Sequence, residues 1–483
     1  MSLSSALSIA QSALLATSKQ TSVVSRNVAD ASNPDYTRRI AVVTSTAPGA
    51  RVVEIQRTAN DLLFRQNLSA LSAWSGQSAL YNGMDQLDLS VNGVDNASSP
   101  STAIANLQKA LQLYATTPSN QNLGTSVVDA AKQVVNSLNS GTQAIQDFRT
   151  QADSQISTAV DDLNSLLSQF QDANKAVISG TRSGTDVSDP LDQRDAILKK
   201  ISEYVPVSTF TRGDNDMVIT TKDGTTLFET VPRSVTFTPS AGYSAGTSGN
   251  TIYIDNVPVS AGTGDTTTAD GKIAGLLKLR DGVASTMQSQ LDEIARGLVT
   301  AFAETSSSQP NAAGLFTWSG APAIPAAGTL VDGLAGSISV NAAFDPSAGG
   351  NPALLRDGGA NGAAYVVNTG GASYSDLLIS YGNKLDQPMA FDSSAGITVS
   401  SGVSDYAANA IGWFEGVRQQ ASTNADSKQA LAARTAEALS NDTGVNVDQE
   451  MSLLLDLEHT YQASAHMMKT VSDMLDSLMA AVG

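Results

Sequence analysis

The residues of this 483-residue chain that could carry out chemistry are few. Gly242-Tyr243-Ser244-Ala245-Gly246 matches the G-x-S-x-G nucleophile elbow, which works on a sharp strand-to-helix turn with a carboxylate and a histidine later in the chain. Gly, Thr, Ser and Asn follow this match, and then a strand pattern, so no helix is predicted to begin there. We interpret the match as coincidental and predict no catalytic residue and no enzyme.

Other possible sites are equally weak. His459 and His466 are the only histidines, and their spacing puts them about 10 Å apart along a helix. They cannot share one metal ion, which needs nitrogens about 2 Å away. The absence of cysteine removes disulfides and thiolate metal sites. Arg212-Gly213-Asp214 spells an integrin-binding tripeptide, but the β-sandwich repeats of an adhesin are absent. We predict no metal and no cofactor.

Composition and charge exclude further classes of protein. The formal charge is −18 at pH 7, so there is no basic surface to bind nucleic acid or anionic membranes. No segment approaches the ~20 consecutive apolar residues of a membrane helix. Residues 1–5 lack a basic region followed by an apolar one, so we expect no cleavable secretory signal. The predicted partners therefore include neither nucleic acid nor membrane.

Each end of the chain carries an apolar pattern that steps by three and four residues. Near the N-terminus its positions are Leu3, Leu7, Ala10, Leu14, Thr17, Thr21, Val24 and Val28. Near the C-terminus they are Leu454, Leu457, Tyr461, Ser464, Met468, Val471, Leu475 and Leu478. This spacing forms one narrow stripe on a helix, the seam of a coiled coil. We predict that the two terminal helices pair with one another or with neighbouring copies, and that the larger apolar residues form the assembly interface.

The ends of these helices can also be predicted. Asn446, with Gln449 three residues later, suits an N-cap for the C-terminal helix. The N-terminal helix should stop before Asn33-Pro34, because a residue preceding proline avoids the α region. Its stripe is weak, since small or polar residues occupy several positions. We therefore expect residues 1–30 and about 445–483 to be disordered in the free monomer and helical in an assembly.

The interior combines long helices with short strands. A single helix is predicted from about 125 to 179, with others at about 59–91, 102–116, 190–203, 271–306 and 402–440. Strand patterns cover 205–238 and 252–259, with a hairpin turn at Lys222-Asp223-Gly224. Shorter strand-like runs lie at 337–340, 364–367 and 397–399 within a Gly-, Ala- and Ser-rich stretch. The predicted fold class is mainly α with β insertions, an α+β multidomain chain.

We predict three parts, each built from segments far apart in the sequence. A terminal coiled-coil domain comprises 1–31 and 441–483. A helical-bundle domain comprises 32–204, 271–306 and 402–440. Residues 205–270 and 307–401 form β-rich or loop-rich outer insertions, placed outside the assembly because surface loops tolerate such insertions.

Three segments resemble the flagellar rod, hook and hook-associated proteins. Asn27 to Arg38, with Pro34 and Tyr36, is similar to the N-terminal signature of that family, although Asp30, Asn33 and Asp35 depart from it. The C-terminal run resembles the family's Gly-Val-x-Val-Asp-x-Glu and Tyr-Gln-Ala phrases; its matching residues are Val447, Asp448, Glu450, Tyr461, Gln462 and Ala463. A third phrase is similar to the hook-associated protein 1 family in particular: Leu191, Asp192, Gln193, Arg194 and Asp195. A weaker match is Gly275 to Asp281.

This resemblance implies a structural junction subunit that links hook to filament. It implies export by the flagellar type III apparatus and an extracellular location in the flagellum. The implied partners are copies of the chain itself, the hook protein, a filament-side hook-associated protein, and an export chaperone at the C-terminal helix.

Alternatives within the same family are the hook protein, hook-associated protein 3 and flagellin. A hook protein should turn β-rich soon after the N-terminal signature, whereas this chain has a long helical pattern before Val205. Flagellin and hook-associated protein 3 are not expected to carry Leu-Asp-Gln-Arg-Asp in this context. A secreted hydrolase and an adhesin are the remote alternatives.

Overall fold

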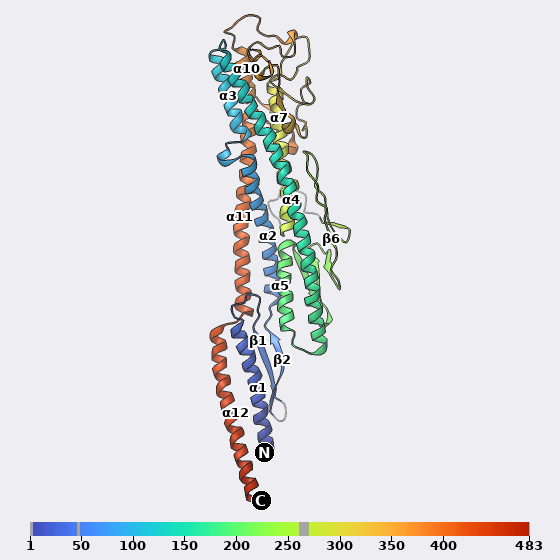
Figure 1. Ribbon diagram of the computed structural model, residues 1–483, viewed down its shortest axis with the longest axis vertical. Coiled ribbons are helices and arrows are strands. Elements are labelled where there is room, and N and C mark those ends of the chain that lie inside the picture. Colours follow the sequence, from blue (N-terminus) through green and yellow to red (C-terminus); the bar gives the residue numbers. More distant parts are fainter. Residues whose placement is uncertain (1–2, 46–48, 260–269, 483) are drawn as a thin grey trace.

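The computed structural model is an elongated molecule with both chain ends at the same end of its long axis (Figure 1). It describes residues 3–45, 49–259 and 270–482, and the side chains up to 481. Met1 and Ser2, part of the segment inspected for a secretory signal, lie outside the described residues, as do 260–269 of the first predicted insertion.

Long helices dominate the structure, as predicted. The helices of eleven residues or more are α1 (Leu3–Ala29), α2 (Asp61–Val91), α3 (Pro100–Thr116), α4 (Gln121–Ser183), α5 (Ser188–Tyr204), α7 (Ala284–Ala301), α10 (Asp376–Asp386), α11 (Val403–Thr443) and α12 (Val447–Val482). Shorter ones are α6 (Lys272–Lys278), α8 (Leu334–Ser337) and α9 (Leu354–Asp357), and a π-helical turn (Leu279–Val283) joins α6 to α7. The predicted mainly α class with β insertions is confirmed.

The strands form small antiparallel sheets. They are β1 (Arg39–Ser45) with β2 (Ala50–Arg57); β3 (Val207–Thr211), β4 (Met217–Thr221) and β5 (Thr226–Phe228); β6 (Val235–Thr236), β7 (Ile252–Ile254) and β8 (Val257–Val259); β9 (Phe316–Thr317) with β10 (Ser339–Val340); and β11 (Met389–Ala390) with β12 (Ser400–Ser401). The predicted turn at 222–224 does join β4 to β5.

Helix α4 shows how the sequence dictates its element. Asn120 caps its start by accepting a hydrogen bond from the Asn122 amide, and Gly184 ends it in the left-handed conformation that favours glycine. Apolar residues at helical spacing bury one face along its length, from Val128 to Phe170. We call the part of the chain from α2 to α11 the body. Helix α4 runs along much of the length of the body (Figure 1).

Three features were not predicted. The hairpin β1–β2, alongside α1, occupies residues to which we assigned no structure. Helix α10 lies in a stretch expected to be loop-rich, although buried Leu378, Tyr381 and Leu385 give it an apolar stripe. The run 364–367 forms no strand; it holds a short 3-10 turn and a single bridge between Val366 and Gly358.

Segment 307–401 packs at the end of the body opposite the chain termini (Figure 1). It contributes buried aromatic residues to the core, because Phe316 and Tyr381 both contact the ring of Phe302 at the end of α7. Strands β3–β8 instead lie along one side of α4 and α5 (Figure 1). The division into three domains and the outward placement of the insertions stay predictions.

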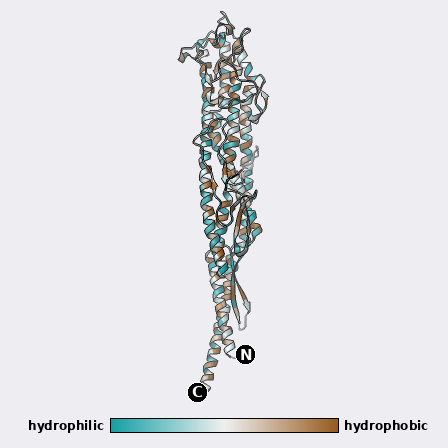
Figure 2. Cartoon of the chain, turned by 90° about the vertical axis from the view of Figure 1, so that its right-hand side faces the viewer, coloured by the Kyte–Doolittle hydropathy of each residue, from teal (hydrophilic) through white to brown (hydrophobic). Residues whose placement is uncertain are grey.

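Hydrophobic and hydrophilic residues are interspersed along the long helices, as expected for helices that bury one stripe each (Figure 2). Among the described residues, no helix combines the length and apolarity needed to cross a membrane.

Candidate functional site

The two terminal helices pack against each other along one side of the molecule (Figure 1). On α1, Ala10, Thr17 and Val24 are buried at seven-residue spacing. On α12 the buried positions with the same spacing are Leu457, Ser464 and Val471. Other members of the predicted stripe are half-buried: Leu3, Leu7, Leu14, Thr21, Val28, Leu454, Met468 and Leu475. Tyr461 and Leu478 are 49% and 53% exposed, so they lie at the margin of the intrachain contact.

A buried hydrogen-bond network fixes the base of this helix pair. Asn27, at the end of α1, is fully buried; its Nδ2 donates to Glu450 Oε2 and to the Arg39 carbonyl, both at 2.9 Å. Its Oδ1 accepts from Tyr36 Oη at 2.8 Å and from the Arg39 amide at 3.1 Å. Glu450, in the first turn of α12, is also fully buried and accepts from Arg38 Nε at 2.6 Å. We call Asn27, Tyr36, Arg38 and Glu450 the register network.

The register network is chemically saturated. Four hydrogen bonds use the full capacity of the Asn27 amide, and an unsatisfied group at this depth would destabilise the fold. Burial raises the pKa of Tyr36 to about 12, with Arg39 opposing the shift, so its hydroxyl keeps the proton that it donates. Because Asn27 and Glu450 bond only when the two helices are aligned, the network determines how α1 and α12 are aligned along their axes.

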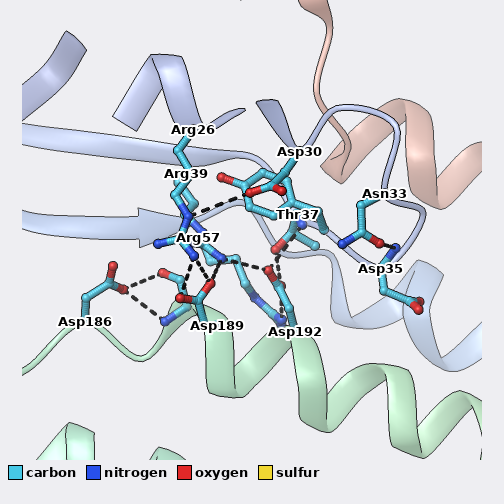
Figure 3. A network of polar contacts seen from close by, with 12 residues as sticks. Arg26, Asp30, Asn33, Asp35, Thr37, Arg39, Arg57, Asp186, Asp189 and Asp192 are labelled. Atoms are coloured by element: carbon cyan, nitrogen blue, oxygen red, sulfur yellow. Dashed lines mark hydrogen bonds and ion pairs between the residues drawn. The ribbon is translucent and has the colours of Figure 1, made fainter. Parts of the chain in front are cut away.

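A second cluster lies beside it, on helix α5 (Figure 3). Three carboxylates at spacings of three residues share one face of this helix. They are Asp189, Asp192 and Asp195, and we call them the α5 carboxylate face.

Arginines from three different elements bind the α5 carboxylate face. Arg26 of α1 donates to both oxygens of Asp189 at 2.6 Å. Arg39 of β1 pairs with Asp189 and, at 3.1 Å, with Asp192. Arg57 of β2 contacts Asp192 at 3.0 Å and Asp195 at 2.7 Å. We call these contacts the junction ion pairs.

The charges at the junction are matched. Burial opposes the charge of Asp189, but hydrogen bonds from Arg26 and Arg39 hold the pKa of its carboxyl below the ordinary value. Burial likewise disfavours the Arg57 cation, yet Asp195 and Asp192 raise its pKa above the ordinary value. Asp189 and Arg57 therefore stay ionised at neutral pH, whereas burial raises the pKa of Asp195 above its ordinary value against the opposing charge of Arg57.

The side chains of the Leu-Asp-Gln-Arg-Asp segment, residues 191–195, make contacts on two sides of α5. Arg194 points away from the junction: its Nη1 donates to Asn174 of α4 at 3.0 Å and to the Asn215 carbonyl at 2.6 Å. Burial lowers the pKa of this guanidinium. Leu191 is half-buried and Gln193 is exposed.

The structure thus brings together only part of the motifs singled out from sequence. Asn27, Tyr36, Arg38, Asp192, Asp195 and Glu450 lie in the two networks. Exposed positions outside them are Pro34, Val447, Asp448, Gln462 and Ala463, along with Tyr461. Sequence reasoning missed Arg26, Arg39 and Arg57, for which the only signal was the run Arg38-Arg39 beside a motif; Asp189 begins the segment that carries the Leu191-to-Asp195 phrase.

The candidate chemical sites are accounted for by structural contacts. The Ser244 loop precedes β7 without any intervening helix, and the Ser244 carbonyl accepts from buried Arg149. Both histidines are exposed on α12. In the Arg-Gly-Asp turn, Arg212 pairs with Asp216 and Asp214 with Arg182. Within the described part of the chain, no group of three or more His, Asp or Glu side chains could hold a metal ion.

Comparison with known proteins connects this architecture to the flagellum. The family model of the flagellar hook-associated protein FlgK helical domain matches residues 84–314. The model of the flagellar basal body rod FlgEFG protein C-terminal matches residues 440–481. Flagellar hook-associated protein 1 of Bacillus subtilis is 20% identical over 522 residues, covering 99% of this chain and 98% of that protein. The chain is similar to hook-associated protein 1 along nearly its whole length.

Other relatives agree. Flagellar hook-associated protein 1 of Salmonella typhimurium is 23% identical over 314 residues, which are 62% of this chain and 56% of that protein. The fold resembles the flagellar hook junction protein FlgK of Burkholderia pseudomallei, with a TM-score of 0.57 and 14% identity over 77% of this chain and 99% of that one. Along this chain, the match to the FlgK helical-domain model runs from the end of α2 to beyond α7. The match to the rod-protein C-terminal model covers α12 up to residue 481.

Proposed function

We propose that this chain is a structural, non-enzymatic junction subunit of the bacterial flagellum, which links hook to filament and assembles through its terminal helices. The observation that carries the proposal is the register network, which joins the two ends of the chain into one aligned helix pair. A pair formed from both chain ends suits a subunit that stacks on copies of itself, because each subunit then presents one compact two-helix unit.

The helix pair leaves apolar surface free for such stacking. Beyond Tyr461 and Leu478, several large apolar residues of α12 are exposed in the single chain: Met451, Leu455, Met467, Met474 and Met479. On one side of α12, Met467 and Met474 lie about two turns apart and Leu478 follows Met474 by about one turn, and exposed apolar residues that gather on one face mark interaction sites. They favour packing against neighbouring copies, the hook protein or a filament-side hook-associated protein, and the same surface suits an export chaperone before assembly.

The remaining parts of the proposal rest on the similarity of this chain to hook-associated protein 1. The chain is exported by the flagellar type III apparatus and is extracellular in the flagellum. The terminal segments 1–31 and 441–483 form the assembling domain, the helical segments form the bundle, and 205–270 and 307–401 face outward.

The decisive experiment is electron microscopy of cells that lack this chain. We expect hooks to be present and filaments absent, with filaments restored by the wild-type gene. Filaments of normal length and number in the deleted strain would contradict the junction role. Straight rods without hooks would instead indicate a more proximal subunit.

A further inference from the structure

The chain passes only twice between the terminal unit, which we define as α1, β1, β2 and α12, and the body. One crossing is residues 58–60 and the other is residues 444–446. The crossings lie close together, because Asn60 Nδ2 donates to Asp442 Oδ2 at 2.9 Å. At the second crossing, Gly444 approaches the preceding helix so closely that a Cβ there would lie 2.4 Å from the Ser440 carbonyl oxygen. Two crossings this close together form a hinge. They do not by themselves define the angle between the terminal unit and the body.

Helix α5 provides the contact that could define the angle. Among the pairs of described elements, β2 with α5 is the most extensive contact between the terminal unit and the body. Polar side-chain contacts join α5 to the terminal unit and to the loop between α1 and β1: the junction ion pairs, the Thr37 hydroxyl on Asp192, and Lys199 with Asp35 at 2.9 Å. The charges are arranged in a complementary way, since arginines of the terminal unit meet carboxylates of α5.

The junction ion pairs are strong enough for this role. The side chain of Arg39 is 2% exposed, and those of Asp192 and Arg57 are 11% and 13% exposed. Salt screens such partly buried pairs far less than surface pairs. Arg57 spreads its planar fork over two carboxylates, with Nη1 on Asp192 and Nη2 on Asp195, and Arg39 meets Asp189 and Asp192 through Nη2 alone. These contacts from the two strands of one hairpin restrict its orientation.

Arg39 connects this contact to the register network. Its backbone amide and carbonyl bond Asn27, while its guanidinium lies 4.6 Å from the centre of the Tyr36 ring and pairs with Asp189 and Asp192. One residue therefore takes part in the pairing of the terminal helices and in their attachment to the body.

We propose that the junction ion pairs hold the terminal unit at a single orientation on the body, with Arg39 as the positioning residue that couples this orientation to the pairing of α1 with α12. Without them, the hinge at 58–60 and 444–446 lets the terminal unit swing. The junction ion pairs thereby hold the hairpin β1–β2, the end of α1 and the start of α12 in one geometry before any neighbouring copy binds.

The test measures the distance between hairpin and body in the full-length monomer. The chain has no cysteine, so spin labels at Glu54→Cys of β2 and Lys200→Cys of α5, both exposed, report one distance by double electron–electron resonance. We expect a narrow distribution in the otherwise unchanged chain. Asp189→Asn with Asp192→Asn should broaden it into several components, and Arg39→Lys, which keeps the charge but loses the fork, should broaden it less.

The matched control is Asp161→Asn with Asp172→Asn, which removes the same two charges from exposed positions of α4. It should leave the distribution narrow. A narrow, unshifted distribution in the Asp189→Asn/Asp192→Asn variant would overturn the proposal, and so would a broad distribution in the unchanged chain. If that double variant fails to fold by circular dichroism, Asp189→Asn alone decides, since Asp189 is 57% exposed and its replacement leaves the less exposed Asp192 in place as a partner for Arg39.

Discussion

Leu457→Asp is the substitution that most directly tests the terminal helices. Leu457 is 6% exposed and is the first of the buried positions of the α12 stripe. Few large apolar side chains of the two helices are buried: among the described residues, only Val23 and Val24 on α1 and Leu457 and Val471 on α12. Each therefore contributes a large share of the pairing free energy.

The size of the effect follows from that burial. Removing a buried leucine side chain costs about 2–5 kcal/mol, and an unpaired carboxylate in its place adds to the cost. Each 1.4 kcal/mol is about tenfold in an equilibrium constant, so the pairing of α1 with α12 should weaken by at least about 30-fold. We expect assembly to be blocked while the body, which Leu457 does not enter, keeps its thermal unfolding transition.

The assay compares assembly of purified protein, followed by sedimentation, with the thermal unfolding of the monomer. His466→Asp is the matched control, because it adds the same charge to α12 at an exposed position about 2.5 turns from Leu457, on the opposite face, where the residues three and four positions away are small or polar. This control should assemble normally. Normal assembly of Leu457→Asp, or equal loss in both variants, would refute the role given to the stripe.

The same reasoning predicts that the helix pair is marginal in isolation. Ordering the backbone costs about 1–2 kcal/mol per residue, and burying a leucine returns about 1.5–3 kcal/mol. With so few buried apolar residues, the stretches of α1 and α12 beyond the register network should become ordered only when neighbouring copies cover their exposed faces, whereas the network and the junction ion pairs keep the base of the pair in place in the monomer. Amide hydrogen exchange on the dilute monomer should show rapid exchange over 454–478; strong protection there would contradict this expectation.

Three further predictions concern the body. Ser244→Ala should leave swimming and assembly unchanged, and esterase activity of the purified chain that vanished with this substitution would overturn the non-enzymatic proposal. Arg280→Met should lower the free energy of urea unfolding by about 3–5 kcal/mol, because it leaves the fully buried Asp153 carboxylate without its ion-pair partner. Adding Asp153→Leu to this variant should recover much of the lost stability. Equal stabilities of the single and double variants would show that the pair is not coupled. Burial raises the pKa of Asp292 to about 6, above the unfolded value of about 3.9, so its stabilising contribution is present below pH 4 and is lost as the pH rises through 6. Asp292→Asn should flatten this part of the curve of unfolding free energy against pH, measured by urea titration. Parallel curves for the two proteins would contradict the prediction.

Helices were predictable from sequence wherever one apolar face repeats over many turns. The predicted helix at 125–179 is α4 at Gln121–Ser183, and Asn446 does cap α12 by accepting from the Gln449 amide at 3.1 Å. The hairpin β1–β2 was missed for a physical reason. Its strands lie on α1 with only Arg39 and Val52 buried, so they lack the regular alternation that marks a half-buried strand.

The candidate site was less predictable than the fold. Motif resemblance selected Asn27 and Glu450, but nothing in the sequence indicated that they meet, because 423 residues separate them. Arg38, the partner of Glu450, stood in a motif, whereas Arg39 and Arg57 could not be recognised as partners of Asp192, since a charged side chain is ordinarily interpreted as a solvated one. Only the folded topology shows that Arg39 is buried against two carboxylates.

The departures from the family signature can be explained in the same physical terms. Asn33 and Asp35 lie on an exposed turn, where the Asn33 side chain accepts a hydrogen bond from the Asp35 amide at 3.1 Å and so builds the turn without glycine. Asp35 then reaches Lys199 of α5, an ion pair of opposite polarity to the arginine contacts beside it. In contrast, the matching residues Asn27, Tyr36 and Glu450 are buried and hydrogen-bonded, where a change of side chain would strand a partner. In this chain the departures at Asn33 and Asp35 therefore face solvent, while Asn27, Tyr36 and Glu450 match the signature in the buried register network.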